Sequence, residues 1–407
     1  MSAVETEASS GKWWLVVLAA ASIAAIAMGL RQAMGLYMKP ISMDLGLGRQ
    51  VFSLAIAIAN LVWGVAAPFV GAISDRYGAA RVAVMGGVTT AIGLYITYAA
   101  QSESMLLVAG IFLGLGVAGA GVNAMVGAAA RAAPVELRTQ AIAALGMGSG
   151  VGILLALPFA HFLIESLGWK SSLLVLLVTA LAILPLSYLI SGKPEKHAAG
   201  TPSQSLGDAL KEAFSLPSYW LLNSGFFVCG FHVAFFSTHL PAYVADQGLA
   251  PGVAVIALTA VGLGNLAGTW AAGQSARFIP KRFGLSIIYF GRAFVFFGFL
   301  FLPITSQSVI ALSFILGLLW LSTIPLTSGL VGTFFGAQWM TMLYGIVFFS
   351  HQIGSFLGAW SAGLVFDATK SYDVMWWVSV ALALFAAIVH LPIREEGVIR
   401  PVPQPAG

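Results

Sequence analysis

The stretch Gly71-Ala-Ile-Ser-Asp75-Arg76-Tyr-Gly78-Ala-Ala-Arg81 is a short charged segment between two long apolar runs, in a chain in which only 8% of the residues are charged. Glycine at positions 71 and 78 permits a tight reversal of the backbone. Asp75 can accept hydrogen bonds at the N-terminus of a facing helix, and Arg76 and Arg81 can bind a lipid phosphate or a carboxylate. These residues predict a conformational hinge between two buried helices.

The composition of the chain places it in a membrane. Hydrophobic residues make up 59% of its 407 residues and the mean hydropathy is +0.93, whereas the apolar fraction of a soluble domain is nearer to about 45 to 50%. Apolar runs recur along nearly the whole chain, enough for roughly twelve helices across a hydrocarbon core ~30 Å thick. Its 46 glycines suit close packing of helices in lipid. The sequence therefore predicts an all-α membrane protein.

A polar stretch divides the apolar runs into two halves of six. Residues 191–217 are rich in Gly, Pro, Ser, Lys and Glu, which is typical of a linker. The expected parts are an N-terminal tail (1–12), a first half (13–190), the linker (191–217), a second half (218–393) and a C-terminal tail (394–407). The expected helices are 13–37, 49–73, 80–100, 105–130, 139–164, 171–190, 219–244, 253–276, 283–303, 308–330, 339–365 and 374–391.

Lysine and arginine are distributed unevenly between the two ends of these helices. With the N-terminus inside, the outer side carries only Lys39, Arg49, Lys170 and Lys370. The inner side collects Lys12, Arg76, Arg81, Arg131, Arg138, Lys193, Lys196, Lys211, Arg277, Lys281, Arg282, Arg394 and Arg400. Because cytoplasmic loops carry the excess of basic residues, we expect a multi-pass protein of the cell (inner) membrane with both termini in the cytoplasm.

Few charged residues fall inside the predicted helices, and they are the first candidates for a substrate site because a charge within a bilayer is costly. Arg31 lies in the first helix, and His232 and His351 lie near the middle of the seventh and eleventh. A guanidinium offers a planar fork to a carboxylate, and a histidine can donate to an anion. Two alternatives remain open: Arg31 can extend toward the lipid headgroups, and each histidine can bond a neighbouring backbone group in the core.

Uncharged polar residues and one more arginine complete the set of candidates. Asn123 and Gln352 can bond a substrate or a neighbouring helix. Arg292, in the ninth helix, is interpreted as a packing residue or one that extends toward the headgroups. No Asp or Glu reaches the middle of a predicted helix, so a co-transported proton would have to ride on a histidine or on the substrate.

The stretch 71–81 resembles the loop between helices 2 and 3 of the major facilitator superfamily, which reads G-x-x-x-D-R-x-G-x-[RK]-[RK]. The match covers Gly71, Asp75, Arg76 and Gly78, and Arg81 stands at the second place of the basic pair of the family, after Ala80. The loop Gly273-Gln-Ser-Ala-Arg277 in the second half is similar to a degraded copy of it. The resemblance implies a secondary transporter made of two six-helix halves that rock about a central cavity.

The segment from Arg31 to Lys39 resembles the end of helix 1 in the monocarboxylate transporters, where a lysine stands eight residues before another lysine. Arg31 matches the substrate-contacting lysine. The chain departs from this group, and from the oxalate/formate antiporters, in residues 253–276, which lack the charged residues that those proteins carry there. The resemblance implies transport of a small organic anion, a monocarboxylate. The expected substrate-binding residues are Arg31, Asn123, His232, His351 and Gln352.

Two other functions stay open, namely efflux of an apolar or neutral compound and sensing without transport. The sequence has no phosphate-binding G-x-x-x-x-G-K-[ST] motif and no nucleophile and base at a plausible depth. We therefore expect a protein that is not an enzyme, with no catalytic residue, metal or cofactor. The expected partners are the organic anion, a co-transported proton and membrane lipids, with no nucleic acid, and we expect a monomer.

The predicted hinge has a testable consequence for Asp75. Asp75→Asn should slow transport and leave the half-saturation concentration of the substrate unchanged, because a hinge residue biases the two states of the carrier without touching the ligand. Initial uptake rates over a range of substrate concentrations measure both quantities. A loss of affinity as large as the loss of rate would contradict the hinge assignment.

Overall fold

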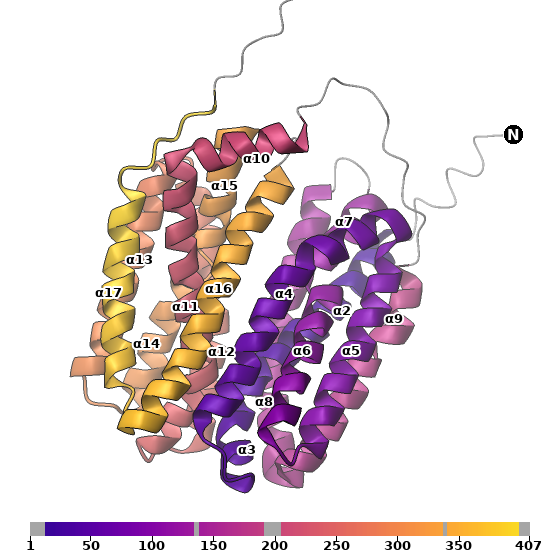
Figure 1. Cartoon of the computed structure of the whole chain (residues 1–407), viewed down its shortest axis with the longest axis vertical. Coiled ribbons are helices and arrows are strands. Elements are labelled where there is room, and N and C mark those ends of the chain that lie inside the picture. Colours follow the sequence, from indigo (N-terminus) through magenta and orange to yellow (C-terminus); the bar gives the residue numbers. More distant parts are fainter. Residues whose placement is uncertain (1–12, 134–137, 191–204, 337–339, 399–407) are drawn as a thin grey trace, which may run out of the picture.

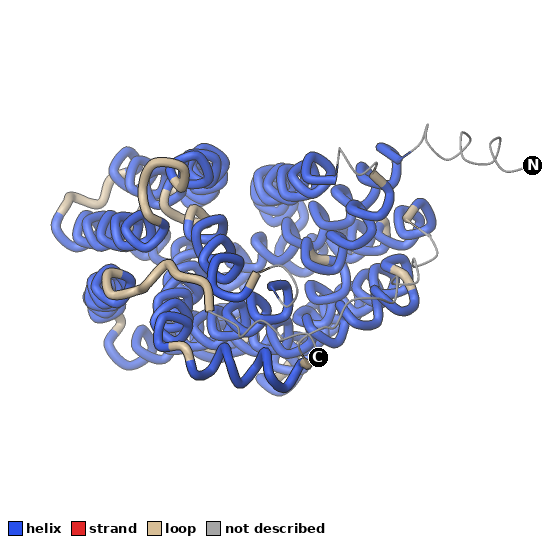
Figure 2. The backbone as a smooth tube through the Cα atoms, turned by 90° about the horizontal axis from the view of Figure 1, so that it is seen from above, coloured by secondary structure: helices blue, strands red, loops and turns tan. Residues whose placement is uncertain are grey.

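The computed structural model describes residues 13–133, 138–190, 205–336 and 340–398. All regular elements in these ranges are helices, and they form two bundles side by side (Figure 1). The same two groups are seen from the end of the molecule in Figure 2. The helix α10 (Leu206–Ser215) lies across one end of the second bundle, and we call that end the linker end.

The first bundle is built from the residues before the linker. The helix α2 (Trp13–Ala33) continues through a 3₁₀ turn, η1 (Met34–Tyr37), into α3 (Met38–Asp44). The other helices are α4 (Arg49–Tyr77), α5 (Ala79–Ala99), α6 (Glu103–Ala120), α7 (Val122–Ala132), α8 (Arg138–Leu181) and α9 (Ile183–Leu189). At Gly168, inside α8, φ is +77°, a conformation that glycine adopts readily, so the chain reverses there.

The second bundle follows α10. Its helices are α11 (Pro217–Asp246), α12 (Pro251–Ser275), α13 (Lys281–Phe301), α14 (Ser306–Leu318), α15 (Thr323–Phe335), α16 (Met340–Thr369) and α17 (Asp373–His390). Among the described residues, 11 helical segments are long and apolar enough to span a membrane. One of them, Ala144–Leu189, reverses at Gly168 and crosses twice. The described chain thus confirms the all-α fold with twelve crossings in two halves.

Three predicted helices differ from the observed ones inside the bilayer region. The predicted helix 105–130 is broken at Gly121, whose backbone is extended (φ −73°, ψ 176°). The predicted helix 308–330 is broken between α14 and α15. The first helix does not end at Tyr37 but runs on through η1 to Asp44. Hydropathy does not detect such breaks, because a broken helix is as apolar as a continuous one.

The turn between α4 and α5 is shorter than the hinge predicted over residues 71–81. Gly71 lies within α4, and the reversal between α4 and α5 occurs at Gly78, where φ is +93°. Arg81 lies with its guanidinium 5.7 Å from the ring centre of Tyr77. The side chains of Asp75 and Arg76 lie outside the described part, so their role stays a prediction.

The segments expected to be a linker and a tail contain ordered structure. In the linker, α10 begins at Ser205, whose hydroxyl accepts the N–H of Asp208 at 3.2 Å, as an N-cap residue does. After α17 the chain continues along the linker end of the second bundle. There Glu395 forms an ion pair with Lys281 at 3.7 Å, and Val398 N–H donates to Phe334 O at 3.0 Å.

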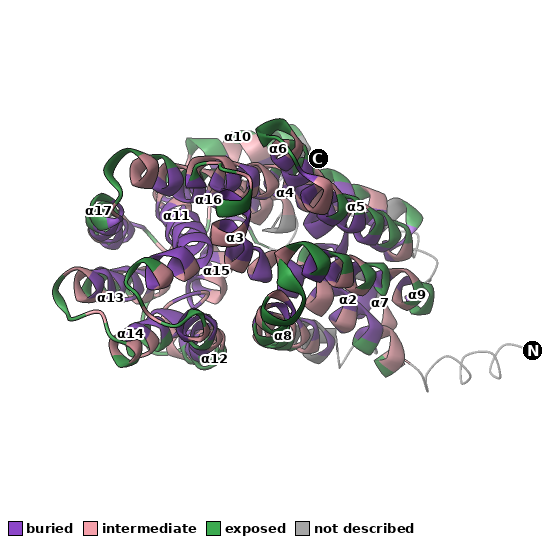
Figure 3. Ribbon diagram, turned by 90° about the horizontal axis from the view of Figure 1, so that it is seen from below, coloured by how far each residue is buried: buried purple, intermediate pink, exposed green. Residues whose placement is uncertain are grey.

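The two bundles meet mainly through α4 and α16, at the end opposite the linker end. A Cβ at Gly64 of α4 would lie 2.7 Å from Cβ of Gln352, and a Cβ at Gly363 of α16 would lie 2.8 Å from Cα of Gln50. Figure 3, seen from this end, shows buried residues where the bundles adjoin. Glycine therefore permits an approach so close that no side chain fits between the helices.

This interface predicts a difference between two glycines of the same helix. Gly363→Ala should force the bundles apart at this end, because the new methyl group meets the backbone of α4. Gly345→Ala is the matched control, since a Cβ there meets nothing within 4 Å. Hydrogen exchange of the first turns of α4 should rise in Gly363→Ala alone. Equal exchange in the two variants would show that the close contact is not required.

Candidate functional site

A cavity of about 40 Å³ lies where the two bundles adjoin, with room for a few water molecules. Most of its wall is apolar and comes from the first bundle. Two residues of α11, Ser237 and Thr238, are the contribution of the second bundle. The polar and aromatic wall of the first bundle includes Arg31 of α2 and Asn60 and Trp63 of α4.

Arg31 is held in this cavity without a counter-ion. Its Nη2 donates to Oδ1 of Asn60 at 2.9 Å, and the guanidinium carbon lies 5.1 Å from the ring centre of Trp63. Within the described ranges, no carboxylate forms an ion pair with Arg31. The amide and the ring stabilise the cation only in part, so the guanidinium retains the capacity to bind an anion.

Asn60 connects Arg31 to the second bundle. It is 2% exposed, and its main-chain oxygen accepts a hydrogen bond from Nε2 of Gln352 at 3.1 Å. The Oε1 of Gln352 lies 3.0 Å from Nδ1 of His351. Since the amide oxygen can only accept, His351 must carry a proton on Nδ1 if this contact is a hydrogen bond. The structure thus joins Arg31, Gln352 and His351 through Asn60.

Asn60 was not among the residues expected from the sequence. Its signal is an amide within the apolar run Ala-Ile-Ala-Ile-Ala-Asn60-Leu-Val-Trp63, a pattern as informative as the one that singled out Asn123. Neither Gln352 nor His351 is among the residues that line the cavity. They contribute to the site by holding Asn60 and the contact between α4 and α16.

The other two expected site residues lie apart from this cavity. His232 is fully buried in the second bundle, with Nε2 3.0 Å from the carbonyl oxygen of Ser379 and its ring 4.7 Å from that of Phe296. Because a carbonyl only accepts, Nε2 carries the proton. Asn123 is exposed near the start of α7. A role for either residue in substrate binding stays a prediction.

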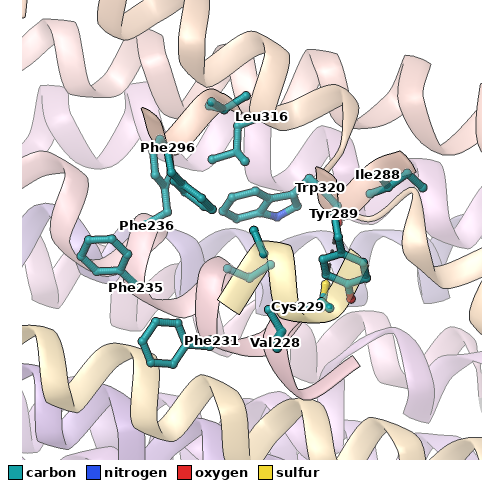
Figure 4. Packing of buried hydrophobic residues seen from close by; sticks show 14 of the residues in the cluster. Val228, Cys229, Phe231, Phe235, Phe236, Ile288, Tyr289, Phe296, Leu316 and Trp320 are labelled. Atoms are coloured by element: carbon teal, nitrogen blue, oxygen red, sulfur yellow. Dashed lines mark hydrogen bonds between the residues drawn. The ribbon is translucent and has the colours of Figure 1, made fainter. Parts of the chain in front are cut away.

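Arg292 does not extend toward the lipid headgroups, so that interpretation is wrong. The structure supports the other interpretation, that Arg292 is a packing residue. Its side chain is 0% exposed, and Nη2 donates to the carbonyl oxygens of Leu319 at 2.7 Å and Trp320 at 2.5 Å. These carbonyls lie in the break between α14 and α15, where helical partners are missing. Figure 4 shows Trp320 beside Phe236, with Tyr289 and Cys229 next to them. Arg292 therefore stabilises a broken helix in the core.

Far from the linker end, four residues join the two bundles, and we call them the clasp: Arg49, Asp246, Asp367 and Tyr372. Arg49 of α4 binds both carboxylate oxygens of Asp246 on α11, at 2.5 and 2.6 Å. Its guanidinium also donates to the hydroxyl of Tyr372 at 3.1 Å. Asp367 of α16 accepts the main-chain N–H groups of Arg49 and Gln50, at 3.1 and 2.8 Å, and so caps α4 from the other bundle.

The clasp continues into the second bundle through a histidine. His239 has Nε2 at 2.8 Å from the carbonyl oxygen of Ala359 and Nδ1 at 2.9 Å from the hydroxyl of Tyr372. The carbonyl requires the proton on Nε2, so in a neutral ring Nδ1 accepts from Tyr372. Burial raises the pKa of the Tyr372 phenol, which keeps its hydroxyl protonated and able to donate. Hydrogen bonds therefore run without interruption from Arg49 to the backbone of α16.

Comparison with known proteins identifies relatives along nearly the whole chain. Residues 17–359 match the family model of the Major Facilitator Superfamily. The mouse protein named Monocarboxylate transporter 11 is 27% identical, over 97% of this chain and 94% of that protein. The Bacillus subtilis (strain 168) protein named Uncharacterized MFS-type transporter YcxA is 25% identical, over 93% of this chain and 94% of that protein. A solved structure, the D-xylose-proton symporter, shares the fold with a TM-score of 0.73 at 15% identity, over 93% of this chain and 97% of that one.

The clasp predicts unequal effects for two aspartates. Asp246→Asn should lower the free energy of unfolding by roughly 1 to 3 kcal/mol, because it leaves the part-buried Arg49 without its counter-ion. Asp44→Asn is the control, since Asp44 and Lys170 are half exposed and 3.9 Å apart, and such pairs contribute about 0 to 1 kcal/mol. Thermal unfolding in detergent measures both. Equal shifts for the two variants would contradict the clasp.

Proposed function

The chain belongs to the Major Facilitator Superfamily of membrane transporters, and from this premise we propose that it carries a small organic anion, a monocarboxylate, across the membrane by alternating access. The observation that supports this proposal is the unpaired guanidinium of Arg31 in a cavity between the two halves. As in its relatives, the function is transport and not catalysis.

The chemistry of Arg31 favours an anion with two coplanar oxygens. A guanidinium presents parallel N–H donors that match a carboxylate, and it stays charged when it is desolvated. A cation as substrate is disfavoured, because the described wall of the cavity contains no carboxylate and does contain a positive charge. Relatives named as monocarboxylate transporters, with similarity along nearly the whole chain, support the same substrate class.

In the proposed cycle, the clasp closes the outer side of the carrier. The distribution of lysine and arginine puts the linker end in the cytoplasm, so Arg49 and Asp246 face the exterior. Opening to the outside then requires the separation of α4 from α16 and of Arg49 from Asp246. The halves rock about the cavity, as in other carriers built from two repeats.

The remaining candidates have different places in this proposal. Gln352 and His351 support Arg31 through Asn60. In the proposed cycle, His232 and Asn123 contact the substrate in another conformational state. The described helices hold no carboxylate beside Arg31. A symported proton would therefore be carried by a histidine or enter with the substrate as the neutral acid.

Substitution of Arg31 tests the proposal. Arg31→Ala should raise the half-saturation concentration for monocarboxylates steeply, because it removes a charge-assisted interaction worth on the order of 2 to 5 kcal/mol. Arg31→Lys should have an intermediate effect, since lysine keeps the charge and loses the planar fork. Uptake of radiolabelled carboxylates into proteoliposomes, with and without a pH gradient, measures both.

The matched control is Arg394→Ala, which removes an exposed arginine after α17 and should leave affinity unchanged. If Arg31→Ala takes up a carboxylate with the affinity of the unmodified protein, the anion assignment is wrong. The apolar wall of the cavity would then favour an uncharged compound.

A further inference from the structure

The second bundle contributes two neighbouring hydroxyl residues of α11 to the wall of the cavity. Ser237 is 7% exposed and Thr238 is 4% exposed, and both line the same cavity as Arg31. Arg31 and the apolar residues of the first bundle thus share one cavity with two hydroxyl residues of the second bundle. None of the substrate-binding residues expected from the sequence occupies this position.

The hydroxyl groups of Ser237 and Thr238 do not donate hydrogen bonds to the backbone of their own helix. A serine or threonine in a helix commonly donates to the carbonyl four residues earlier, as Thr97 does to Gly93 at 2.8 Å and Ser187 does to Ile183 at 2.6 Å. Among the described residues, Ser237 and Thr238 have no such partner and no other hydrogen bond. Both hydroxyls are therefore available to a ligand in the cavity.

The backbone of α11 adds a third polar group at the same place. Pro241 lies inside α11, four residues after Ser237, and has no N–H with which to bond the carbonyl of Ser237. That carbonyl points toward α2 and η1, because a Cβ at Gly35 would lie 2.5 Å from its oxygen. Gly35 is one helical turn, about 6 Å, beyond Arg31. The Ser237 carbonyl therefore lies against η1, next to the two hydroxyl residues that share the cavity wall with Arg31.

We propose that Ser237 and Thr238 are the substrate-binding residues of the second half, and that they select monocarboxylates with a hydroxyl group next to the carboxylate. The carboxylate lies on Arg31, while the substrate hydroxyl exchanges hydrogen bonds with the side chains of Ser237 and Thr238. When the substrate hydroxyl donates, the oxygen of one of these two side chains accepts. This inference rests on the proposed function and adds to it the part of the site that distinguishes one carboxylate from another.

The assignment also explains how both halves of the transporter can respond to a bound substrate. A substrate held only by Arg31 would touch the first half alone, and its binding could not bias their relative position. Interactions with α11 make the substrate itself a link between the halves, and a ligand shifts a conformational equilibrium only by its differential affinity for the two states. The hydroxyl contacts supply that difference.

The test uses two probes, propionate and 2-hydroxypropionate, which differ in a single hydroxyl. Affinities are measured by calorimetry on the purified full-length protein. The unmodified protein should prefer 2-hydroxypropionate by roughly tenfold, the size expected for one or two neutral hydrogen bonds. The double variant Ser237→Ala, Thr238→Val, which preserves shape, should lose this preference and bind propionate within about twofold of the original affinity.

Ser224→Ala is the matched control on the same helix, because the Ser224 hydroxyl donates to Trp220 O at 2.9 Å and should not affect either probe. Melting temperatures report whether each variant is folded, and the single variants replace the double one if it is not. An unmodified protein without preference for 2-hydroxypropionate, or a preference that survives both substitutions, overturns this inference alone. Failure of both probes to bind, or binding that survives Arg31→Ala, overturns the proposed function.

Discussion

The need to hold a permanent positive charge among apolar helices shapes this structure, and three arginines meet it in three ways. Arg49 is paired with the carboxylate of Asp246. Arg292 is surrounded by carbonyl oxygens at the break between α14 and α15. Arg31 has only the amide oxygen of Asn60 and the face of Trp63. Since an uncompensated buried charge is costly, the first two arginines are structural, whereas Arg31 is the one to which we assign an anion under the proposed function.

The contacts between the halves explain why the cavity lies where it does. On one side, the carbonyl of Ser237 is pressed against Gly35; on another, Gln352 lies against Gly64. These contacts involve backbone or the first side-chain atoms, so they leave no room between the helices. The space beside Arg31 lies between these contacts, and its wall includes the polar residues Asn60, Ser237 and Thr238. Close helix contacts and the cavity therefore lie next to each other at the junction of the two bundles.

The sequence predicts the crossings well because a bilayer requires long apolar segments, and length can be counted directly. It also singles out Arg31, since a charge in such a segment is conspicuous. It does not predict the break at Gly121 or the one after α14, because hydropathy carries no information on backbone torsion. For a different reason, the sequence does not single out Asn60, Ser237 or Thr238. A neutral polar residue in a helix usually bonds its own backbone, and only the packing of α4 and α11 shows that these do not.

Two of the hydrogen-bonded contacts between the halves lie at different depths along α4. The clasp around Arg49 lies at the end of α4, whereas the bond from Gln352 to Asn60 lies three helical turns deeper, beside the cavity. Under the proposed function, a substrate that binds the Arg31 guanidinium competes with Asn60 Oδ1 for its donors, and the main-chain oxygen of Asn60 is the group that Gln352 holds. The inner contact is therefore linked to the cavity through Asn60. The clasp is connected to the cavity through α4 and also through α11, on which Thr238 of the cavity wall directly precedes His239 of the clasp.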